Sequence, residues 1–369
     1  MEAMPSAAEE MGAHPMETWV LSRHDIAEIV AAVGRDELMG RIIDRLTEGF
    51  AEIGRGAREL SPLRDGFERT EPVRGIFEWM PHRDPGDSIT LKNVGYSPGN
   101  PKHFGLPTII GTVARYDDST GALTALMDGV LLTALRTGAA SAVASRLLAR
   151  PDSRTLGLIG AGAQAVTQLH ALSLVFPLER VLVWDTDPAH RDSFARRAAF
   201  TGIPVECADP ARIAAEADII TTATSVPTGG GPVLPDGPHR EHLHINAVGA
   251  DLIGKTELPL SLLRRAFVTA DHPEQAHREG ECQRLAPHQT GPGLTRLAAE
   301  PALAHARRGA LTVFDSTGFA FEDALAMEVF LEAAAEHGLG SRLQIEHHPA
   351  DTVDPYALQP LPVAAPARH

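Results

Sequence analysis

The sequence predicts an α/β protein with two domains: a doubly wound parallel sheet, and an α+β domain formed by the N- and C-terminal segments. The 369 residues suffice for two cores at roughly 150 residues per domain. From residue 155 onward, apolar runs alternate with helix-like stretches, which is typical of parallel strands buried on both faces. Before them, residues 61–113 contain short β-like pieces broken by Pro and Gly, which indicates an antiparallel sheet.

Composition excludes several classes of protein. The apolar share of 43% and charged share of 22% are those of an ordinary globular chain. The net charge of −15 repels phosphate backbones and anionic lipids, so we expect neither nucleic acid nor a membrane as partner. No apolar run is long enough to span a bilayer, and the N-terminus is acidic where a signal peptide is basic. Cys207 and Cys282 have no metal-ligand spacing, which predicts no metal site and a cytoplasmic location.

The N-terminal region is predicted to contain one strand and two helices. The strand covers residues 18–21, and Ser22 with Asp25 resembles a capping box that opens the first helix. The second helix ends at Gly54 and Gly56. Apolar stripes support both helices: Ile26, Ile29, Val30 and Val33 in the first, and Leu38, Ile42, Ile43, Leu46 and Phe50 in the second.

Two further helices frame the predicted parallel sheet. Residues 131–150 are rich in small side chains with helical period, which predicts a helix packed closely against another backbone. Residues 319–337 predict a long amphipathic helix that ends at Gly338 and returns the chain to the first domain.

A glycine-rich turn points to a dinucleotide. Gly160, Gly162 and Ala165 lie between an apolar strand and a helix, in the G-x-G-x-x-G/A pattern of a Rossmann-type domain. The first glycine permits the tight turn, the second lets a pyrophosphate approach, and the helix N-terminus supplies amide donors. Such a triplet also occurs as a purely structural turn, so it needs a second signal.

The second signal is Asp185, which ends the next predicted strand about 20 residues beyond the turn. A carboxylate there binds the ribose 2′-hydroxyl and repels a 2′-phosphate, which favours NAD over NADP. Arg191 and Arg196 lie nearby and leave NADP open.

With these residues in view, the chain resembles the ornithine cyclodeaminase and mu-crystallin family over nearly its whole length. Within that family it is similar to the actinobacterial lysine cyclodeaminases, which supply L-pipecolate to macrolide and streptogramin assembly. The family segments are EWMP, LKNVGYSPGNP, GLPT, DGVLLTALRTGAASA, GAGAQ, INAVGADLIGKTEL and FDSTGFAFED, and those of the lysine branch include MPHR, YSPGN and TSVPTGGGPVLP.

The resemblance implies an ammonia-lyase that cyclises L-lysine without net oxidation. Bound NAD⁺ takes a hydride from Cα, the ε-amine attacks the resulting imine, ammonia leaves, and the hydride returns to the cyclic imine. It also implies a homodimer built through residues 61–113.

The resemblance assigns three cations to the substrate carboxylate, which must be held so that Cα stays aligned. They are Arg64, Lys92 and Arg136; the alternative for each is an ordinary cation in solvent. Asp251 is expected to move protons between the two nitrogens, the alternative being a turn cap. Glu78 is expected to meet the distal amine, the alternative being an exposed strand residue.

The remaining positions that match the family are one substrate residue and a set of cofactor residues. The substrate residue is Thr317. Besides Gly160, Gly162 and Asp185, the cofactor set comprises Thr108, Arg136, Thr137, Ala163, Gln164, Thr224, Val248, Gly249, Ala250, Asp251, Lys255 and Ser316.

The predicted domain division follows from these assignments. Disordered tails are expected at 1–17 and 358–369, a substrate-binding and dimerisation domain at 18–145 with 321–357, and the Rossmann domain at 146–320.

Three other functions remain open on the sequence. An ornithine cyclodeaminase that forms L-proline needs the same residues. An NAD(P)H-dependent imine reductase or amino acid dehydrogenase would consume cofactor in proportion to product. A mu-crystallin-like binding protein would keep the nucleotide domain without the chemistry.

Overall fold

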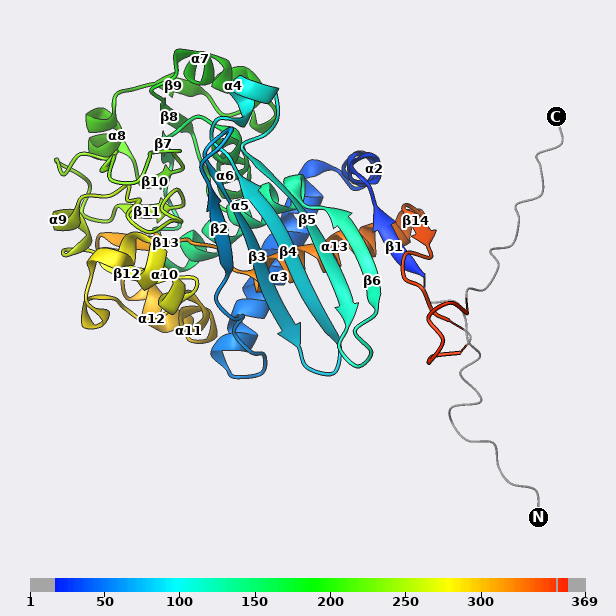
Figure 1. The fold of residues 1–369 in the computed structure, drawn as a ribbon. Helices are drawn as coiled ribbons and strands as arrows, with labels where there is room; N and C mark the ends of the chain where they lie inside the picture. Colours follow the sequence, from blue (N-terminus) through cyan, green and yellow to red (C-terminus); the bar gives the residue numbers. More distant parts are fainter. Residues whose placement is uncertain (1–16, 350, 358–369) are drawn as a thin grey trace.

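The computed structural model describes residues 17–349 and 351–357, which form two seven-stranded sheets with helices around them (Figure 1). The tails predicted at 1–17 and 358–369 lie outside the described residues, apart from Glu17. No helix in the described part of the chain is both long and apolar enough to cross a membrane. The division at residues 146 and 320 stays a prediction.

The first sheet has the order β14-β1-β6-β5-β4-β3-β2. Its strands β2 to β5 form the antiparallel sheet that the sequence predicts for residues 61–113, and β6 extends this sheet beyond the predicted bounds. The sheet is mixed, however, because β1 pairs with β6 in parallel, and the long connection between these two strands contains three helices and the strands β2 to β5. Its strands are β1 (Thr18–Leu21), β2 (Asp65–Arg69), β3 (Gly75–Asp84), β4 (Ser88–Tyr96), β5 (Ile109–Asp117), β6 (Leu123–Asp128) and β14 (Ser341–Leu343).

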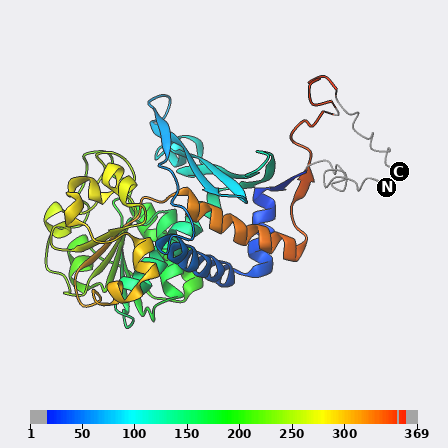
Figure 2. The ribbon, with the colours of Figure 1, turned by 90° about the horizontal axis from the view of Figure 1, so that it is seen from below.

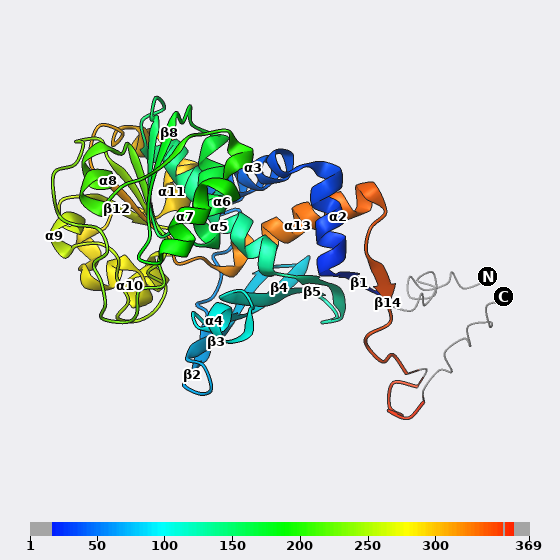
Figure 3. The same cartoon turned by 90° about the horizontal axis from the view of Figure 1, so that it is seen from above.

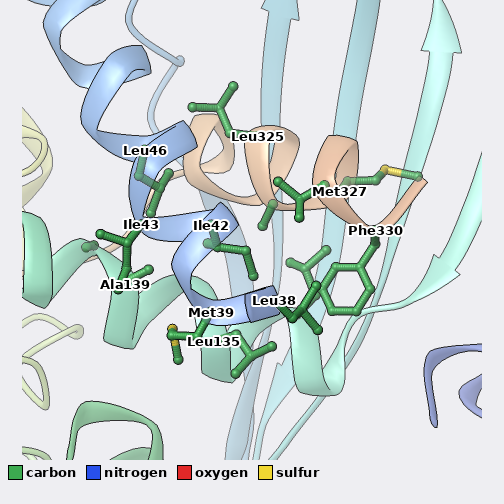
Figure 4. Packing of buried hydrophobic residues seen from close by; sticks show 14 of the residues in the cluster. Leu38, Met39, Ile42, Ile43, Leu46, Leu135, Ala139, Leu325, Met327 and Phe330 are labelled. Carbon is green, nitrogen blue, oxygen red and sulfur yellow. The ribbon is translucent and has the colours of Figure 1, made fainter. Parts of the chain in front are cut away.

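Helices cover only one face of this sheet (Figure 2). Four helices pack there around a common apolar core, in which Leu38, Ile42, Leu135 and Phe330 meet (Figure 4). The capping box at Ser22 and Asp25 is confirmed. The four helices are α2 (Arg23–Val33), α3 (Arg35–Gly54), α5 (Val130–Leu148) and α13 (Ala320–His337).

The opposite face of the sheet carries exposed aromatic side chains. Phe77 and Trp79 alternate along β3 with the buried Glu78 and Met80, so the two pairs point to opposite faces. Phe67 on the neighbouring strand is 55% exposed and stacks on Phe77. This outer face, defined by Phe67, Phe77, Trp79 and Ile110, is a large apolar surface open to contact.

The second sheet is parallel throughout, with the order β12-β13-β11-β10-β7-β8-β9. It confirms the doubly wound sheet, and adds β9 and β13, which the sequence analysis did not predict. Its strands are β7 (Thr155–Ile159), β8 (Arg180–Trp184), β9 (Val205–Cys207), β10 (Ile219–Thr222), β11 (His244–Ala247), β12 (Phe267–Ala270) and β13 (Thr312–Asp315).

Shorter helices connect the strands of the second sheet. They are α6 (Ala163–Ser173), α7 (Pro188–Arg197), η1 (Ala199–Thr201), α8 (Pro210–Glu216), α9 (Leu260–Leu263), α10 (Pro273–Glu279), η2 (Glu281–Arg284), η3 (Pro287–Gln289), α11 (Leu294–Ala299) and α12 (Pro301–His305). One further short helix, α4 (Asn100–Phe104), connects β4 and β5 of the first sheet.

Helix α13 runs from the end of β13 along the first sheet, as predicted (Figure 3). The prediction that it is amphipathic is wrong for its first half. Because the helix lies between α3, α5 and the sheet, side chains on several of its sides are buried, among them the carboxylates of Glu322 and Asp323. Both acids therefore need cationic partners inside the protein.

Candidate active site

The glycine-rich turn has the geometry of an anion-binding site at the start of α6. Gly160 has φ +99°, and a Cβ there would lie 2.5 Å from the Ala223 carbonyl oxygen, so only glycine fits. Gly162 precedes α6, and no atom lies within 4 Å of the place where its Cβ would be. The turn thus leaves open space directly beside the helix N-terminus, where a phosphate is favoured.

Asp185 lies beside this turn and supports it. Its carboxylate accepts hydrogen bonds from the Ala161 N–H at 2.7 Å and the Asp187 N–H at 2.8 Å. Arg191 lies over the Trp184 ring at 5.7 Å and binds Asp192. Arg197, which the sequence analysis missed, donates to the Ala161 carbonyl at 2.5 Å and holds the turn from the other side.

A buried carboxylate joins two loops at the carboxyl edge of the second sheet. Glu257 Oε1 accepts from the Thr224 N–H at 2.7 Å and from its hydroxyl at 2.6 Å. Glu257 Oε2 accepts from the Gly249 N–H at 2.8 Å, and the Val248 N–H donates to the Thr222 carbonyl at 2.9 Å. The predicted cofactor loops therefore lie together, at the edge where doubly wound sheets bind ligands.

Lys92 and Arg136 form a buried pair of cations under the crevice. Lys92 Nζ lies 3.0 and 3.2 Å from the two Asp323 oxygens, and Arg136 Nε lies 3.1 Å from Asp323 Oδ1. Arg136 Nη1 donates to Glu322 Oε2 at 2.7 Å. Lys92 is 1% and Arg136 5% exposed, so the alternative of cations in solvent is wrong.

The charges of this cluster depend on one another. Burial, and next the neighbouring Arg136, lower the pKa of Lys92 to about 8. Burial raises the pKa of Glu322 to about 8, against the Arg136 guanidinium, which lowers it. Within the described part of the chain Arg136 Nη2 makes no hydrogen bond, which leaves a donor for a ligand carboxylate.

Arg64 connects the two halves of the crevice. Its Nε lies 2.6 Å from Glu279 and 3.2 Å from Glu78. Its other nitrogens donate to the backbone carbonyls of Thr317 at 3.0 Å and Asp251 at 2.7 Å. Glu78 is buried, so the alternative of an exposed strand glutamate is wrong, and burial raises the pKa of Glu78 despite Arg64.

Asp251 faces the crevice from the loop after β11. Its Oδ1 lies 3.1 Å from Lys255 Nζ, and its side chain is 29% exposed. The alternative of a turn cap is not supported, because the Gly254 N–H donates to Gln283 instead. Lys255 is itself buried and lies 3.4 Å from the Tyr96 hydroxyl of β4.

The segment after β13 is organised by Asp271, a buried acid that the sequence analysis missed. Asp271 accepts from the Thr317 hydroxyl at 3.1 Å, the Ser316 hydroxyl at 3.4 Å and the Gly318 N–H at 2.7 Å. Gly318 has φ +72°, and a Cβ there would lie 2.4 Å from Arg136 Nη1. This segment therefore packs directly against the clamp cation.

The other predicted positions make mainly local contacts. The Thr137 hydroxyl donates to the Thr133 carbonyl inside α5, and Gln164 binds the Thr167 hydroxyl at 3.1 Å. The Thr108 carbonyl accepts from the Ser97 N–H, and Ala163 begins α6. Ala250 is buried beside Asp251. No cluster of His, Cys, Asp or Glu among residues 17–349 and 351–357 could hold a metal ion.

Among the acids that pair with the clamp, Glu279 had no recognisable signal in the sequence, whereas Glu322 and Asp323 end the family segment FDSTGFAFED but were assigned no role there. Glu279 lies on α10, and Glu322 and Asp323 lie on α13, where charged residues usually face solvent. Only the fold brings them to Arg64, Lys92 and Arg136.

Fold and site together define a dinucleotide-binding α/β protein in which β4 of the first sheet and helix α5 carry the buried cations Lys92 and Arg136. The chain belongs to the ornithine cyclodeaminase/mu-crystallin family, whose model matches residues 23–338.

Individual relatives agree with that assignment. The L-lysine cyclodeaminase of Streptomyces rapamycinicus is 53% identical over 343 residues, covering 93% of this chain and all of the relative. A solved lysine cyclodeaminase structure, described as the basis for its recognition of L-lysine, L-ornithine and L-2,4-diaminobutyric acid, is 80% identical with TM-score 0.92, and covers 93% of this chain and all of its own. An archaeal alanine dehydrogenase dimer with bound NAD is 29% identical with TM-score 0.79, and covers 90% of this chain and all of its own.

Proposed function

We propose that this protein is an L-lysine cyclodeaminase, which converts L-lysine to L-pipecolate and ammonia with NAD as a catalytic cofactor. Two observations support the proposal: the likeness to lysine cyclodeaminases favours lysine as the substrate, and the buried cations Lys92 and Arg136, together with the Asp251 and Lys255 pair, supply the charges that the reaction needs. Its relatives at 53% and 80% identity bear that name.

The residues at the crevice fit NAD. Open space beside Gly162 and the start of α6 suits the pyrophosphate, and Asp185 suits an adenosine ribose. The loops at Thr224 and Gly249, fixed by Glu257, and the residue Ser316 would hold the nicotinamide half. When bound, NAD⁺ supplies a hydride acceptor for the substrate Cα and later returns that hydride.

The clamp would bind the substrate carboxylate and fix Cα. Lys92 adds a point charge, and Arg136 has a free nitrogen that can donate to a carboxylate oxygen. Because the same carbon must give up and regain a hydride, a clamp that prevents rotation about Cα contributes directly to the rate. Arg64, which donates a hydrogen bond to the Thr317 carbonyl, would lie beside the substrate carboxylate.

Asp251 would move the protons that ring closure requires. The ε-amine of L-lysine must be neutral to attack the imine carbon, and the α-nitrogen must gain protons to leave as ammonia. A carboxylate within reach of both nitrogens can accept the first proton and deliver it to the second. Glu78, buried on the first sheet, would attract the distal amine of a diamino acid.

Other activities would use the same residues. L-Ornithine would give L-proline, and one methylene provides only about 1–3 kcal/mol of discrimination, so the fold does not decide between the two rings. A reductase or dehydrogenase would leave the hydride on the cofactor. A pure binding protein has no need for the Asp251, Lys92 and Arg136 arrangement.

A homodimer through the outer face is part of the proposal. Phe67, Phe77, Trp79 and Ile110 form an exposed apolar surface on the strands of residues 61–113. Burying such a surface against a second copy would remove it from water. The cytoplasmic location and the role in antibiotic biosynthesis remain predictions from composition and from resemblance.

The test is to incubate the purified protein with catalytic NAD⁺ and L-lysine labelled with ¹⁵N at the α-position, and with L-ornithine in parallel. Mass spectrometry should find unlabelled pipecolate and labelled ammonia without net NADH. Faster proline formation from ornithine would move the protein to the ornithine branch. Absence of any ring product would favour a reductase or a binding protein.

A further inference from the structure

Tyr96 is the last residue of β4, on the same sheet face as Lys92. The pleat puts Lys92, Val94 and Tyr96 on one side of the strand, so Tyr96 lies on the side that faces the crevice. Its hydroxyl lies 3.4 Å from Lys255 Nζ, and the same ammonium lies 5.1 Å from the centre of its ring. Tyr96 is thus a contact from the first sheet to a loop of the second.

Lys255 depends on that contact because it is almost completely buried. It is 2% exposed, and among the described residues its side-chain partners are Asp251 at 3.1 Å and the Tyr96 hydroxyl. Burial lowers the pKa of Lys255, but the Asp251 carboxylate outweighs burial and raises it above its ordinary value. A charged ammonium with only two acceptors is therefore oriented by both of them.

The phenol itself is protonated. Burial raises the pKa of Tyr96 against the nearby Lys255, which lowers it. The Tyr96 hydroxyl is therefore a neutral oxygen that can accept a hydrogen bond from the Lys255 ammonium.

We propose that Tyr96 is a positioning residue, whose hydroxyl fixes Lys255 and through it the Asp251 carboxylate across the closed crevice. This inference rests on the proposed function, since it concerns the orientation of Asp251 during proton transfer. Without the hydroxyl, Lys255 keeps its charge and the ring beneath it, but loses the acceptor that sets its direction. Asp251 can then rotate with it, away from the substrate nitrogens.

The test compares Tyr96→Phe with Tyr116→Phe. Tyr116 lies on β5 opposite Ile89, at the other end of β4 from Tyr96, and serves as the matched control. For Tyr96→Phe we expect kcat for pipecolate formation to fall about tenfold, with KM for L-lysine and Kd for NAD⁺ within about twofold of the original. Amide hydrogen exchange in residues 249–256 should become about threefold faster. Tyr116→Phe should change none of these.

Each outcome of this test either supports or overturns the proposal for Tyr96. An unchanged kcat in an active Tyr96→Phe enzyme overturns the proposal. A fall in kcat accompanied by an equal loss of NAD⁺ affinity, or by a lower melting temperature, also overturns it, because the residue would then act on cofactor binding or on folding. If the unaltered protein makes no ring product, the proposed function fails first. Amide hydrogen exchange in residues 249–256 then tests the contact between Tyr96 and Lys255 separately. Equal exchange rates in the unaltered protein and in Tyr96→Phe would overturn the proposal.

Discussion

Replacing Asp323 by Asn removes the carboxylate on which both clamp cations depend. Asp323 is fully buried and lies within 3.2 Å of Lys92 and 3.1 Å of Arg136. Removing one partner of a buried ion pair costs about 3–5 kcal/mol, because a charge is left uncompensated. Arg136 keeps Glu322, so Lys92 takes most of the loss.

Lys92 can reduce this loss of stability by becoming neutral. It can release its proton, and at pH 7.5 doing so from an ordinary lysine pKa costs about 4 kcal/mol. Because the pKa of Lys92 is already lowered to about 8, the variant should hold a neutral Lys92 at this pH. For a chain of this size we expect a melting temperature about 4–6 °C lower. The clamp also loses a charged hydrogen bond to the substrate, so KM for L-lysine should rise about 10- to 100-fold.

Calorimetry and steady-state assays of pipecolate formation measure both effects. Glu332→Gln is the matched control, since Glu332 lies on the same helix and pairs with Arg45 at 2.7 Å while half of its side chain is exposed. An exposed pair contributes at most about 1 kcal/mol, so this control should resemble the original protein. If Asp323→Asn has the melting temperature and KM of Glu332→Gln, the clamp does not depend on Asp323 and the reasoning is wrong.

Three further predictions follow from the same geometry. Gly162→Val should fold normally, because no atom lies within 4 Å of its Cβ position, yet bind NAD⁺ at least about tenfold more weakly in calorimetric titration; unchanged affinity would move the pyrophosphate elsewhere. KM for L-lysine should rise above pH about 8, where Lys92 loses the proton and the charge that hold the carboxylate, and a KM that is flat from pH 7 to 10 would exclude charged Lys92 from substrate binding. Asp251→Asn should abolish turnover, monitored as pipecolate, while NAD⁺ still binds, and full activity would exclude Asp251 from proton transfer.

The sequence predicts best what depends on local chemistry. The capping box at Ser22 and the turn at Gly160 are each set by neighbours a few residues apart, and the structure has both. The position of the cofactor site could be predicted from the glycine-rich turn. The parallel pair of β1 and β6 was missed because it joins strands about 100 residues apart in sequence, separated by three helices and four other strands.

The acidic partners of the clamp could not be predicted for a related reason. Asp323 looks in sequence like an ordinary charged residue of a helix, and only packing of α13 against the first sheet buries it beside Lys92. Glu279 reaches Arg64 across 215 positions of the chain. Neither pairing has a periodicity or a motif, so both emerge only when the two sheets are placed together.

The measurement that tests the account most directly follows one hydrogen atom. L-Lysine deuterated at Cα is incubated with the enzyme and a small fraction of an equivalent of NAD⁺, and the pipecolate is analysed by mass spectrometry and NMR. The account predicts many turnovers per NAD⁺, with deuterium kept at C2 of the product, because the same hydride leaves and returns. Pipecolate without deuterium at C2, or NADH accumulating in proportion to product, would contradict a redox-neutral cyclisation.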